Sequence, residues 1–295
     1  MNKIIVIVGP TGVGKTKLSI SLAKKYHGEI VNADAMQVYK ELDIGTAKIM
    51  ESEKEGVPHY LFDIRNVKEE YSIYDYQKEC RNIIDDILSR GKTPILVGGT
   101  GLYIKACLYD YKLTENPIKN DQLETKTLEE LNKIYQELDP VGFSKIDTKN
   151  KRRVINAIRY YQNNQKSISD NKTTNLLYDC FFIGLTTERK NLYHLIDKRV
   201  DKMIMDGLEE EVRFFYDQGI FTKPLLGGIG YKEFYRYFAG EISFDDAVSE
   251  IKRNSRRYAK RQYTFFRHQL PVHWFETNYD HFDQTVKMVS DYIES

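Results

Sequence analysis

The stretch Gly9-Pro10-Thr11-Gly12-Val13-Gly14-Lys15-Thr16 decides the fold of this chain. An apolar, β-branched run, Ile4–Val8, precedes it, and a segment with helical spacing of apolar residues, 17–25, follows it. Strand, glycine-rich loop and helix in this order form the context of a phosphate-binding P-loop. The glycines let successive backbone N–H groups turn toward an anion, and the helix N-terminus adds its positive end. We expect Lys15 to bridge phosphate oxygens and the Thr16 hydroxyl to face a Mg²⁺ ion.

The composition is that of a soluble globular protein. The chain has 295 residues, of which 41% are hydrophobic and 29% charged, with a net charge of +1, enough for one large domain or two of ordinary size. It has no apolar run of transmembrane length, and the first apolar run leads into the glycine loop and not into a cleavage site. The three cysteines, Cys80, Cys107 and Cys180, lack metal-ligand spacing. These observations predict a cytoplasmic protein with no membrane segment.

The first third of the chain alternates between strand and helix patterns. In an open α/β sheet the ligand site lies beyond the carboxyl ends of the strands. The glycine loop, Asp34 and residues 98–100 each follow an apolar run, so we expect them to converge on one crevice. The predicted fold class is α/β, a P-loop NTPase-like core with a parallel sheet flanked by helices. Its further predicted elements are strands at 29–33, 60–64 and 93–97 and a helix at 73–89.

The character of the sequence changes near residue 114. From there to about residue 178 the chain is polar, with helix patterns at 124–138 and 151–162. A strand-like run at 180–185 then returns to the sheet pattern, and the last third is predicted to be mostly helical. We therefore predict two domains, namely a P-loop core of residues 1–113 and 179–295 and a helical insertion domain of residues 114–178.

Asp34 ends the second predicted strand. A carboxylate there can accept a proton or help to hold a metal, and a helix N-cap is the equally weighted alternative. The strand at 93–97 ends in Gly98-Gly99-Thr100 and not in the carboxylate that holds the metal's second shell in many P-loop ATPases. This pattern disfavours plain nucleotide hydrolysis and leaves room for another substrate that carries linked phosphates.

A basic stripe is predicted on one helix near the end of the chain. No acidic residue occurs between Glu250 and Glu276, while basic residues recur there at helical spacing. A face of single sign suits a polyanion, either RNA or bound diphosphate, and a solvated surface is the alternative. A second cluster opens the helix at 151–162, so we expect a ligand large enough to touch both. The basic stripe comprises Lys252, Arg253, Arg256, Arg257, Lys260 and Arg261, and the second cluster Lys149, Lys151, Arg152, Arg153 and Arg159.

Arg213 lies in a predicted helix that begins after Gly207. Its guanidinium could reach back to the phosphates as a second cation. The alternative is an ion pair on the helix surface with Glu209 or Glu210, which stand four and three residues before it.

Together these segments resemble the tRNA dimethylallyltransferase (tRNA isopentenyltransferase) family. The resemblance covers nearly the whole chain and rests on an ordered set of motifs at 9–16, 34–39, 43–48, 57–64, 98–103, 207–213, 229–233 and 257–262. It implies an enzyme that transfers a dimethylallyl group from dimethylallyl diphosphate to N6 of the adenosine next to the anticodon (position 37) of tRNA, with release of diphosphate. By the same resemblance the P-loop would hold that diphosphate with Mg²⁺.

The resemblance also implies roles for individual residues. Lys15, Thr16 and Arg213 would stabilise the charge of the leaving group, and Asp34 would take the proton of the attacking amine. The adenosine would flip out of its stack, and the insertion and the basic stripe would grip the anticodon stem-loop. The residues implied in tRNA binding are Asp34, Ala35, Met36, Gln37, Thr100, Arg152, Arg153, Val154, Ile155, Asn156, Lys252, Arg256, Arg257 and Lys260.

Some positions depart from the family pattern. Ala35 stands where many members have serine, Asn156 where an arginine is usual, and Asn150 where an aspartate is usual. An arginine expected early in the insertion is not evident at 121–124. These differences concern the RNA contacts and leave the chemistry in place.

Three other functions are compatible with the sequence. An adenylate isopentenyltransferase would act on free AMP, ADP or ATP and would need no RNA grip, so the basic clusters favour tRNA. A P-loop nucleotide kinase would use ATP and no allylic diphosphate. A catalytically silent RNA-binding protein would not depend on Asp34. Nothing in the sequence requires more than a monomer.

Overall fold

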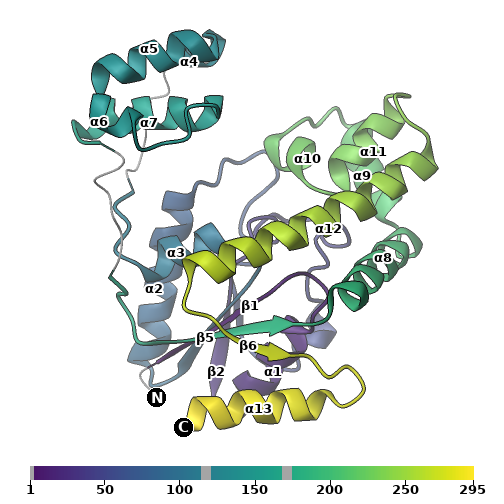
Figure 1. The fold of residues 1–295 in the computed structure, drawn as a ribbon. Helices are drawn as coiled ribbons and strands as arrows, with labels where there is room; N and C mark the ends of the chain where they lie inside the picture. The colour runs from purple at the N-terminus through teal and green to yellow at the C-terminus, as the bar shows by residue number, and fades with distance from the viewer. Residues whose placement is uncertain (1–2, 114–120, 168–174) are drawn as a thin grey trace. The chain divides into compact units, whose positions relative to one another are not determined.

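The computed structural model describes residues 3–113, 121–167 and 175–295 (Figure 1). The chain divides into two compact units. The core unit comprises Met1–Ser72, Tyr76–Leu108 and Tyr178–Ser295, and the helical unit comprises Ile73–Asp75 and Tyr109–Leu177. The second segment of the helical unit thus begins a few residues before the insertion domain predicted at 114–178.

Six parallel strands form the sheet of the core unit, in the order β3-β2-β4-β1-β5-β6. The strand β1 is central and fully buried, and its Val6 pairs with Leu96 on one side and Phe182 on the other. This sheet and its flanking helices confirm the predicted α/β class. The strands are β1 (Ile4–Val8), β2 (Gly28–Asn32), β3 (His59–Tyr60), β4 (Thr93–Val97), β5 (Cys180–Thr186) and β6 (His273–Glu276).

The predicted strands agree with the structure except at two places. The strand predicted at 60–64 ends at Tyr60, because Leu61 and Asp63 adopt positive φ angles of 63° and 54°. The last strand, β6, was not predicted. Only its Phe275 is buried, so the edge strand carries little apolar signal.

Helices cover both faces of the sheet (Figure 1). α1 (Lys15–Lys25) and α13 (Phe282–Glu294) pack together, and their apolar side chains join those of the strands in one core. α2 (Ile73–Ser89) packs against α3 (Gly101–Leu108), where the rings of Tyr76 and Tyr103 stack at 4.0 Å. The helices follow from their amphipathic patterns, since the buried positions of α2 recur every three or four residues.

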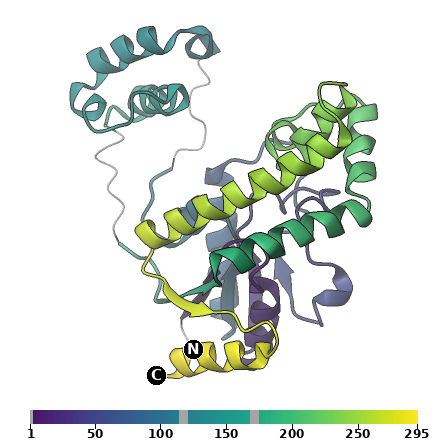
Figure 2. The same cartoon turned by 45° about the vertical axis from the view of Figure 1, so that its right-hand side comes forward.

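A second group of helices with its own apolar core completes the core unit. The 26-residue α12 is the longest element, and α8 runs alongside it (Figure 2). The group consists of α8 (Arg189–Met205), α9 (Leu208–Asp217), α10 (Lys223–Gly227), α11 (Tyr231–Phe238) and α12 (Phe244–Gln269). A short 3-10 helix, η1 (Glu51–Glu53), lies earlier in the chain, between β2 and β3.

The segment around β6 and α13 supports the glycine loop. The Thr277 hydroxyl donates a hydrogen bond to the backbone oxygen of Val13 at 3.0 Å. The Phe282 ring packs over Gly14, where a Cβ atom would lie 2.6 Å from that ring. Gly14 also has a φ of +92°, which disfavours any other residue.

The helical unit has a small core of its own, formed mainly by α5 and α7 together with Leu123 of α4. The helix predicted at 124–138 is divided in two, because the Thr127 side chain caps a new helix by accepting from the backbone N–H of Glu130. Asn150 likewise caps α7 through the backbone N–H of Arg153. The elements are α4 (Asp121–Thr125), α5 (Leu128–Leu138), α6 (Pro140–Phe143) and α7 (Lys151–Asn164). The loop predicted at 163–175 falls mostly outside the described residues. None of the helices described in either unit is long and apolar enough to cross a membrane.

Candidate active site

A cavity of about 580 Å³ lies in the core unit, at the carboxyl ends of β1, β2 and β4. The glycine loop, the segment after β2 and the segment after β4 all line it, as the sequence predicts. Its polar lining includes Thr11, Lys15, Thr16, Asp34, Gln37 and Arg199, and its apolar lining includes Met36, Ile196, Val200 and Met203.

Lys15 is held by its own loop. Its Nζ donates hydrogen bonds to the backbone oxygens of Gly9 at 3.0 Å and Pro10 at 2.7 Å. Burial lowers the pKa of Lys15 to about 7, the charge of Arg199 acts in the same direction, and that of Asp34 opposes it. The glycine loop is thus folded with its lysine in place, and an anion that enters the cavity would favour the charged form of that lysine.

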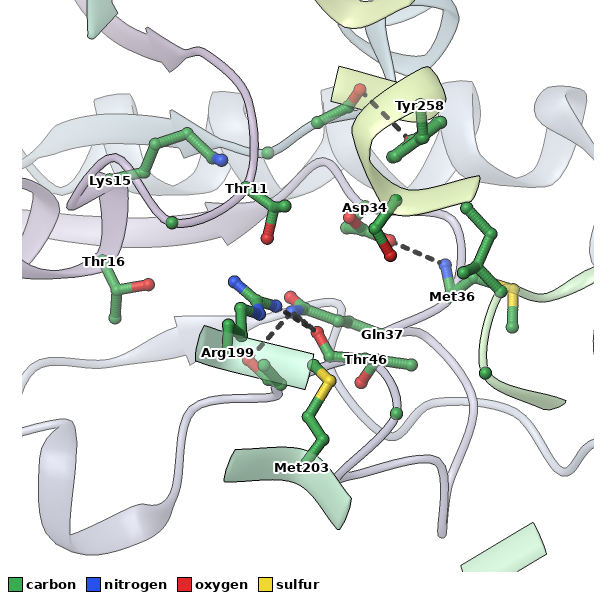
Figure 3. A pocket seen from close by; sticks show the side chains of 18 of the residues that line it. Thr11, Lys15, Thr16, Asp34, Met36, Gln37, Thr46, Arg199, Met203 and Tyr258 are labelled. Atoms are coloured by element: carbon green, nitrogen blue, oxygen red, sulfur yellow. Dashed lines mark hydrogen bonds between the residues drawn. The ribbon is translucent and has the colours of Figure 1, made fainter. Parts of the chain in front are cut away.

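Arg199 is a second cation of the cavity, supplied by α8. Figure 3 shows its guanidinium pointing into the space bordered by Thr11 and Asp34. It donates to the backbone oxygen of Thr46 at 3.4 Å. Burial lowers the pKa of Arg199 to about 10, still charged at neutral pH, while Asp34 acts to raise it. Sequence reasoning missed this residue, because an arginine within an amphipathic helix has no local signal.

Asp34 follows β2 and is fixed by short-range hydrogen bonds. Its backbone N–H donates to Oδ1 of Asn32 at 2.8 Å, and its own Oδ1 accepts from the backbone N–H of Met36 at 2.9 Å (Figure 3). No helix begins here, so the carboxylate caps a turn and not a helix. This arrangement holds the side chain at the cavity wall and leaves Oδ2 outside that hydrogen bond.

The segment after β4 forms the opposite border. The hydroxyl of Thr100 accepts from the backbone N–H of Ala35 at 3.0 Å and so links the two strand ends. The backbone oxygen of Gly99 accepts from Nε2 of Gln262 on α12 at 3.0 Å. Gln262 lines the cavity, and its buried Oε1 has no hydrogen-bond partner within the described residues. Burial and the charge of Asp34 raise the pKa of Tyr258 beside it, which keeps the phenol neutral.

The loop of residues 43–48 forms another wall. Nε2 of Gln37 donates to the backbone oxygen of Thr46 at 3.0 Å (Figure 3). The Lys48 side chain is only 4% exposed, and its Nζ contacts carboxylate oxygens of Asp43 at 2.7 Å and Asp63 at 2.6 Å. The buried ammonium of Lys48 and these two half-exposed carboxylates anchor the loop of residues 43–48.

The predicted P-loop residues divide into those at the cavity and those behind it. Thr11, Gly12, Gly14, Lys15 and Thr16 line the cavity, whereas Gly9, Pro10 and Val13 do not. Within the segment predicted to contact tRNA, Met36 and Gln37 line the cavity, and Ala35 and Thr100 stand behind it.

Arg213 does not reach the cavity. Its side chain is 47% exposed, donates to Oε1 of Glu209 at 2.6 Å and lies over the ring of Phe238. The structure therefore shows the ion pair that the sequence left as the alternative, and Arg199 occupies the position expected of Arg213.

The basic stripe on α12 is partly neutralised by α8. Lys252 pairs with Asp201 at 2.5 Å, and Arg256 pairs with Asp197. Asp201 and Asp197 lie more than fifty positions earlier in the sequence, so the local charge pattern of α12 could not predict these ion pairs. Arg257 and Lys260 are exposed and make no ion pair with any residue that the structure describes.

The segment of the helical unit predicted to bind tRNA lies on α7. Arg152, Arg153 and Asn156 are exposed there. Val154 and Ile155 are 0% and 1% exposed and belong to the core of the unit. The side chains of Val154 and Ile155 cannot contact RNA. Of the five residues predicted to bind tRNA here, only Arg152, Arg153 and Asn156 present exposed side chains.

The cavity offers few protein oxygens to a metal ion, which suits a Mg²⁺ ion whose other ligands are substrate phosphates and water. Across the described ranges, no group of three or more His, Cys, Asp or Glu side chains could hold a metal ion. Thr16 and Asp34 do border the cavity. Mg²⁺ in phosphate sites is typically bound by one or two protein oxygens, substrate phosphates and water, and these two side chains fit that requirement.

Comparison with known proteins places these features in one family. The family model described as IPP transferase matches residues 37–269. The chain is 46% identical over 299 residues to the tRNA dimethylallyltransferase of Anoxybacillus flavithermus, covering 99% of this chain and 96% of that protein. It is 47% identical over 304 residues to the tRNA dimethylallyltransferase of Geobacillus thermodenitrificans, with the same coverage.

Solved structures give the same result. The tRNA isopentenylpyrophosphate transferase of Staphylococcus epidermidis is 39% identical, with a TM-score of 0.75, and the match covers 100% of this chain and 99% of that one. A eukaryotic dimethylallyltransferase acting on tRNA is 31% identical, with a TM-score of 0.88, and the match covers 100% of this chain and 80% of that one.

Proposed function

The chain belongs to the IPP transferase family, and from this premise we propose that it is a tRNA dimethylallyltransferase. It transfers a dimethylallyl group from dimethylallyl diphosphate to N6 of the adenosine next to the anticodon of tRNA and releases diphosphate. The observation that carries the proposal is the single cavity in which Lys15 and Arg199 stand opposite Asp34. Two cations suit a leaving diphosphate, and the carboxylate suits an amine that must lose a proton.

The glycine loop and Arg199 would hold the diphosphate. The amides of the loop and the start of α1 present donors to its oxygens, and Lys15 and Arg199 supply positive charge in a partly buried site. Negative charge grows on the diphosphate as the C1–O bond breaks and the electron pair leaves with oxygen. Fixed donors and cations therefore stabilise the transition state more than the ground state.

Mg²⁺ would be held by Thr16, with Asp34 nearby and the phosphates as its other ligands. When bound, it supplies further positive charge to the leaving group. The residues of the chain perform the remaining functions of orientation and proton transfer.

Asp34 would act as the general base. The lone pair of N6 forms the new C–N bond to C1 of the dimethylallyl group, and the N6 proton passes to the carboxylate. The Met36 backbone N–H holds Oδ1 at 2.9 Å, so Oδ2 is the oxygen free to receive the proton. Gln262 Oε1 offers the adenine a further acceptor.

The apolar lining would receive the hydrocarbon part of the substrate. Met36, Val200 and Met203 border the same cavity as the two cations. A branched five-carbon group gains free energy by leaving water for such a surface, and the surface also excludes water from a reactive allylic carbon.

Exposed cations favour tRNA over a free nucleotide as the acceptor. Arg257 and Lys260 on α12, and Arg152 and Arg153 on α7, are exposed, and backbone phosphates are suitable partners. We further propose action as a monomer, because one chain supplies every residue that we assign to the cavity, and a cytoplasmic location, because tRNA is the substrate.

The decisive experiment measures which acceptor is labelled. The protein is incubated with Mg²⁺, labelled dimethylallyl diphosphate, and either unmodified tRNA or AMP. We expect label on tRNA alone. Label on AMP alone would make the protein an adenylate isopentenyltransferase, and ATP-dependent phosphorylation with no label on either acceptor would make it a kinase.

A further inference from the structure

A carboxylate outside the cavity holds one of the cavity walls. Glu211, on α9, does not line the cavity but accepts hydrogen bonds from three successive backbone N–H groups. Its Oε2 accepts from Asp43 at 3.0 Å and Ile44 at 2.7 Å, and its Oε1 accepts from Gly45 at 3.1 Å. Oε1 also accepts from the Tyr231 hydroxyl at 2.6 Å.

The loop is shaped for this carboxylate. Three consecutive amides that point at one side chain form a concave anion site of the kind that also binds phosphates. A Cβ at Gly45 would lie 2.7 Å from the Tyr231 ring, so only glycine lets the backbone approach that ring and reach Glu211. Tyr231 is fully buried and lines the cavity. Its ring packs against Gly45 and so fixes the position of the loop of residues 43–48.

The residue that follows this turn contacts the cavity cation. The backbone oxygen of Thr46 accepts from Nη2 of Arg199 at 3.4 Å and from Nε2 of Gln37 at 3.0 Å. Glu211 therefore holds the backbone N–H of Gly45, and the next residue, Thr46, supplies the carbonyl oxygen that accepts from the Arg199 guanidinium.

We propose that Glu211 is a positioning residue for diphosphate binding: by holding the amides of residues 43–45, it sets the Thr46 carbonyl that orients Arg199. This inference rests on the proposed function, which assigns the diphosphate to Lys15 and Arg199. Glu211 touches neither substrate and acts through the loop.

The negative charge of Glu211 is what the arrangement requires. A carboxylate accepts all four hydrogen bonds, whereas a glutamine of the same shape has only one acceptor oxygen and presents an NH₂ group to donors. At least one of the three backbone N–H groups or the Tyr231 hydroxyl would lose this partner, and the loop would shift to recover a hydrogen bond.

The test compares Glu211→Gln with Glu210→Gln, the exposed neighbour on the same turn. Binding of inorganic diphosphate with Mg²⁺ is measured by calorimetry. We expect Glu211→Gln to weaken diphosphate binding on the order of tenfold, and to raise the KM for dimethylallyl diphosphate in the same proportion. The Kd for tRNA should be unchanged, and Glu210→Gln should behave as the unaltered protein.

A double-mutant cycle separates positioning from a general loss of structure. In an Arg199→Ala background, Glu211→Gln should have no further effect on diphosphate binding, because the group through which it acts is gone. An equal effect in both backgrounds would overturn the inference, as would wild-type diphosphate binding by Glu211→Gln itself.

Two further arms keep the result interpretable. If Glu211→Gln does not fold, Tyr231→Phe removes one of the four hydrogen bonds and should weaken diphosphate binding to a smaller extent, again only when Arg199 is present. The calorimetric arm uses no tRNA and no prenyl transfer. A protein that binds diphosphate but labels no tRNA would therefore refute the proposed function while the role of Glu211 is still decided.

Discussion

The Oδ1 atom of Asp34 accepts the backbone N–H of Met36 at 2.9 Å, so one carboxylate oxygen is committed to the backbone and the other is not. The geometry of the turn is thus independent of the charge on the second oxygen. This allows the chemical role of the carboxylate to be tested without loss of its structural role.

Asp34→Asn should abolish most of the activity and leave binding intact. The amide oxygen can still accept from Met36, but the amide nitrogen cannot take a proton from N6 of adenosine. We expect kcat to fall by roughly a hundredfold or more, with an unchanged Kd for tRNA. Rates and tRNA binding measured on the same preparation check this, and a kcat near that of the unaltered protein would show that Asp34 is not the base.

Arg199→Ala should have a much larger effect than Arg213→Ala. Arg199 borders the cavity, whereas Arg213 is exposed and paired with Glu209. We expect kcat/KM for dimethylallyl diphosphate to fall by about a hundredfold for Arg199→Ala and to stay within about twofold for Arg213→Ala. Steady-state kinetics of the two variants decide the matter. The reverse order would restore the role that the sequence assigned to Arg213.

Diphosphate binding should take up a proton above pH 7. Burial holds the pKa of Lys15 at about 7 in the free protein, so at pH 8 the amine is mostly neutral. A bound anion raises that pKa, and the amine becomes charged on binding. The binding enthalpy at pH 8 should therefore vary with the ionisation enthalpy of the buffer, and less so at pH 6, after the protons released or bound by diphosphate are subtracted. Lys15→Met should lose this component of proton uptake.

The ion pairs between α8 and α12 divide the basic stripe into two groups. Arg257→Gln and Lys260→Gln should each reduce the slope of log affinity against log salt for tRNA by about 1. Lys252→Gln and Arg256→Gln should change it less, because Asp201 and Asp197 already neutralise these residues. Binding isotherms at several salt concentrations measure the slopes, and equal changes in all four variants would contradict this division.

The sequence predicted the parts of the fold whose information is local. The bounds of β1, α2 and β4 agree with the prediction, because each is an apolar run or an amphipathic repeat between clear end signals. The edge strand β6 was missed because its partner β5 supplies the pairing and only Phe275 supplies burial.

For the candidate active site, too, the sequence predicted only the residues that a local pattern marks. The glycine loop and Asp34 are marked by the strands that precede them, and the structure brings both to one cavity. Arg199 and Glu211 have no such mark, because their roles arise from the packing of α8 and α9 against segments more than 150 positions away in the sequence. Nothing in a local pattern distinguishes them from Arg213 and Glu210.

The support of the glycine loop by later residues has a consequence for biosynthesis. Val13 receives its hydrogen bond from Thr277, which is 264 positions later in the chain, and the Phe282 ring that packs over Gly14 comes later still. During translation the loop emerges long before the residues that brace it, and contacts of such sequence separation form late in folding. The nascent chain therefore cannot form these two supporting contacts until Phe282 has been synthesised, so the glycine loop is braced only after translation has reached α13.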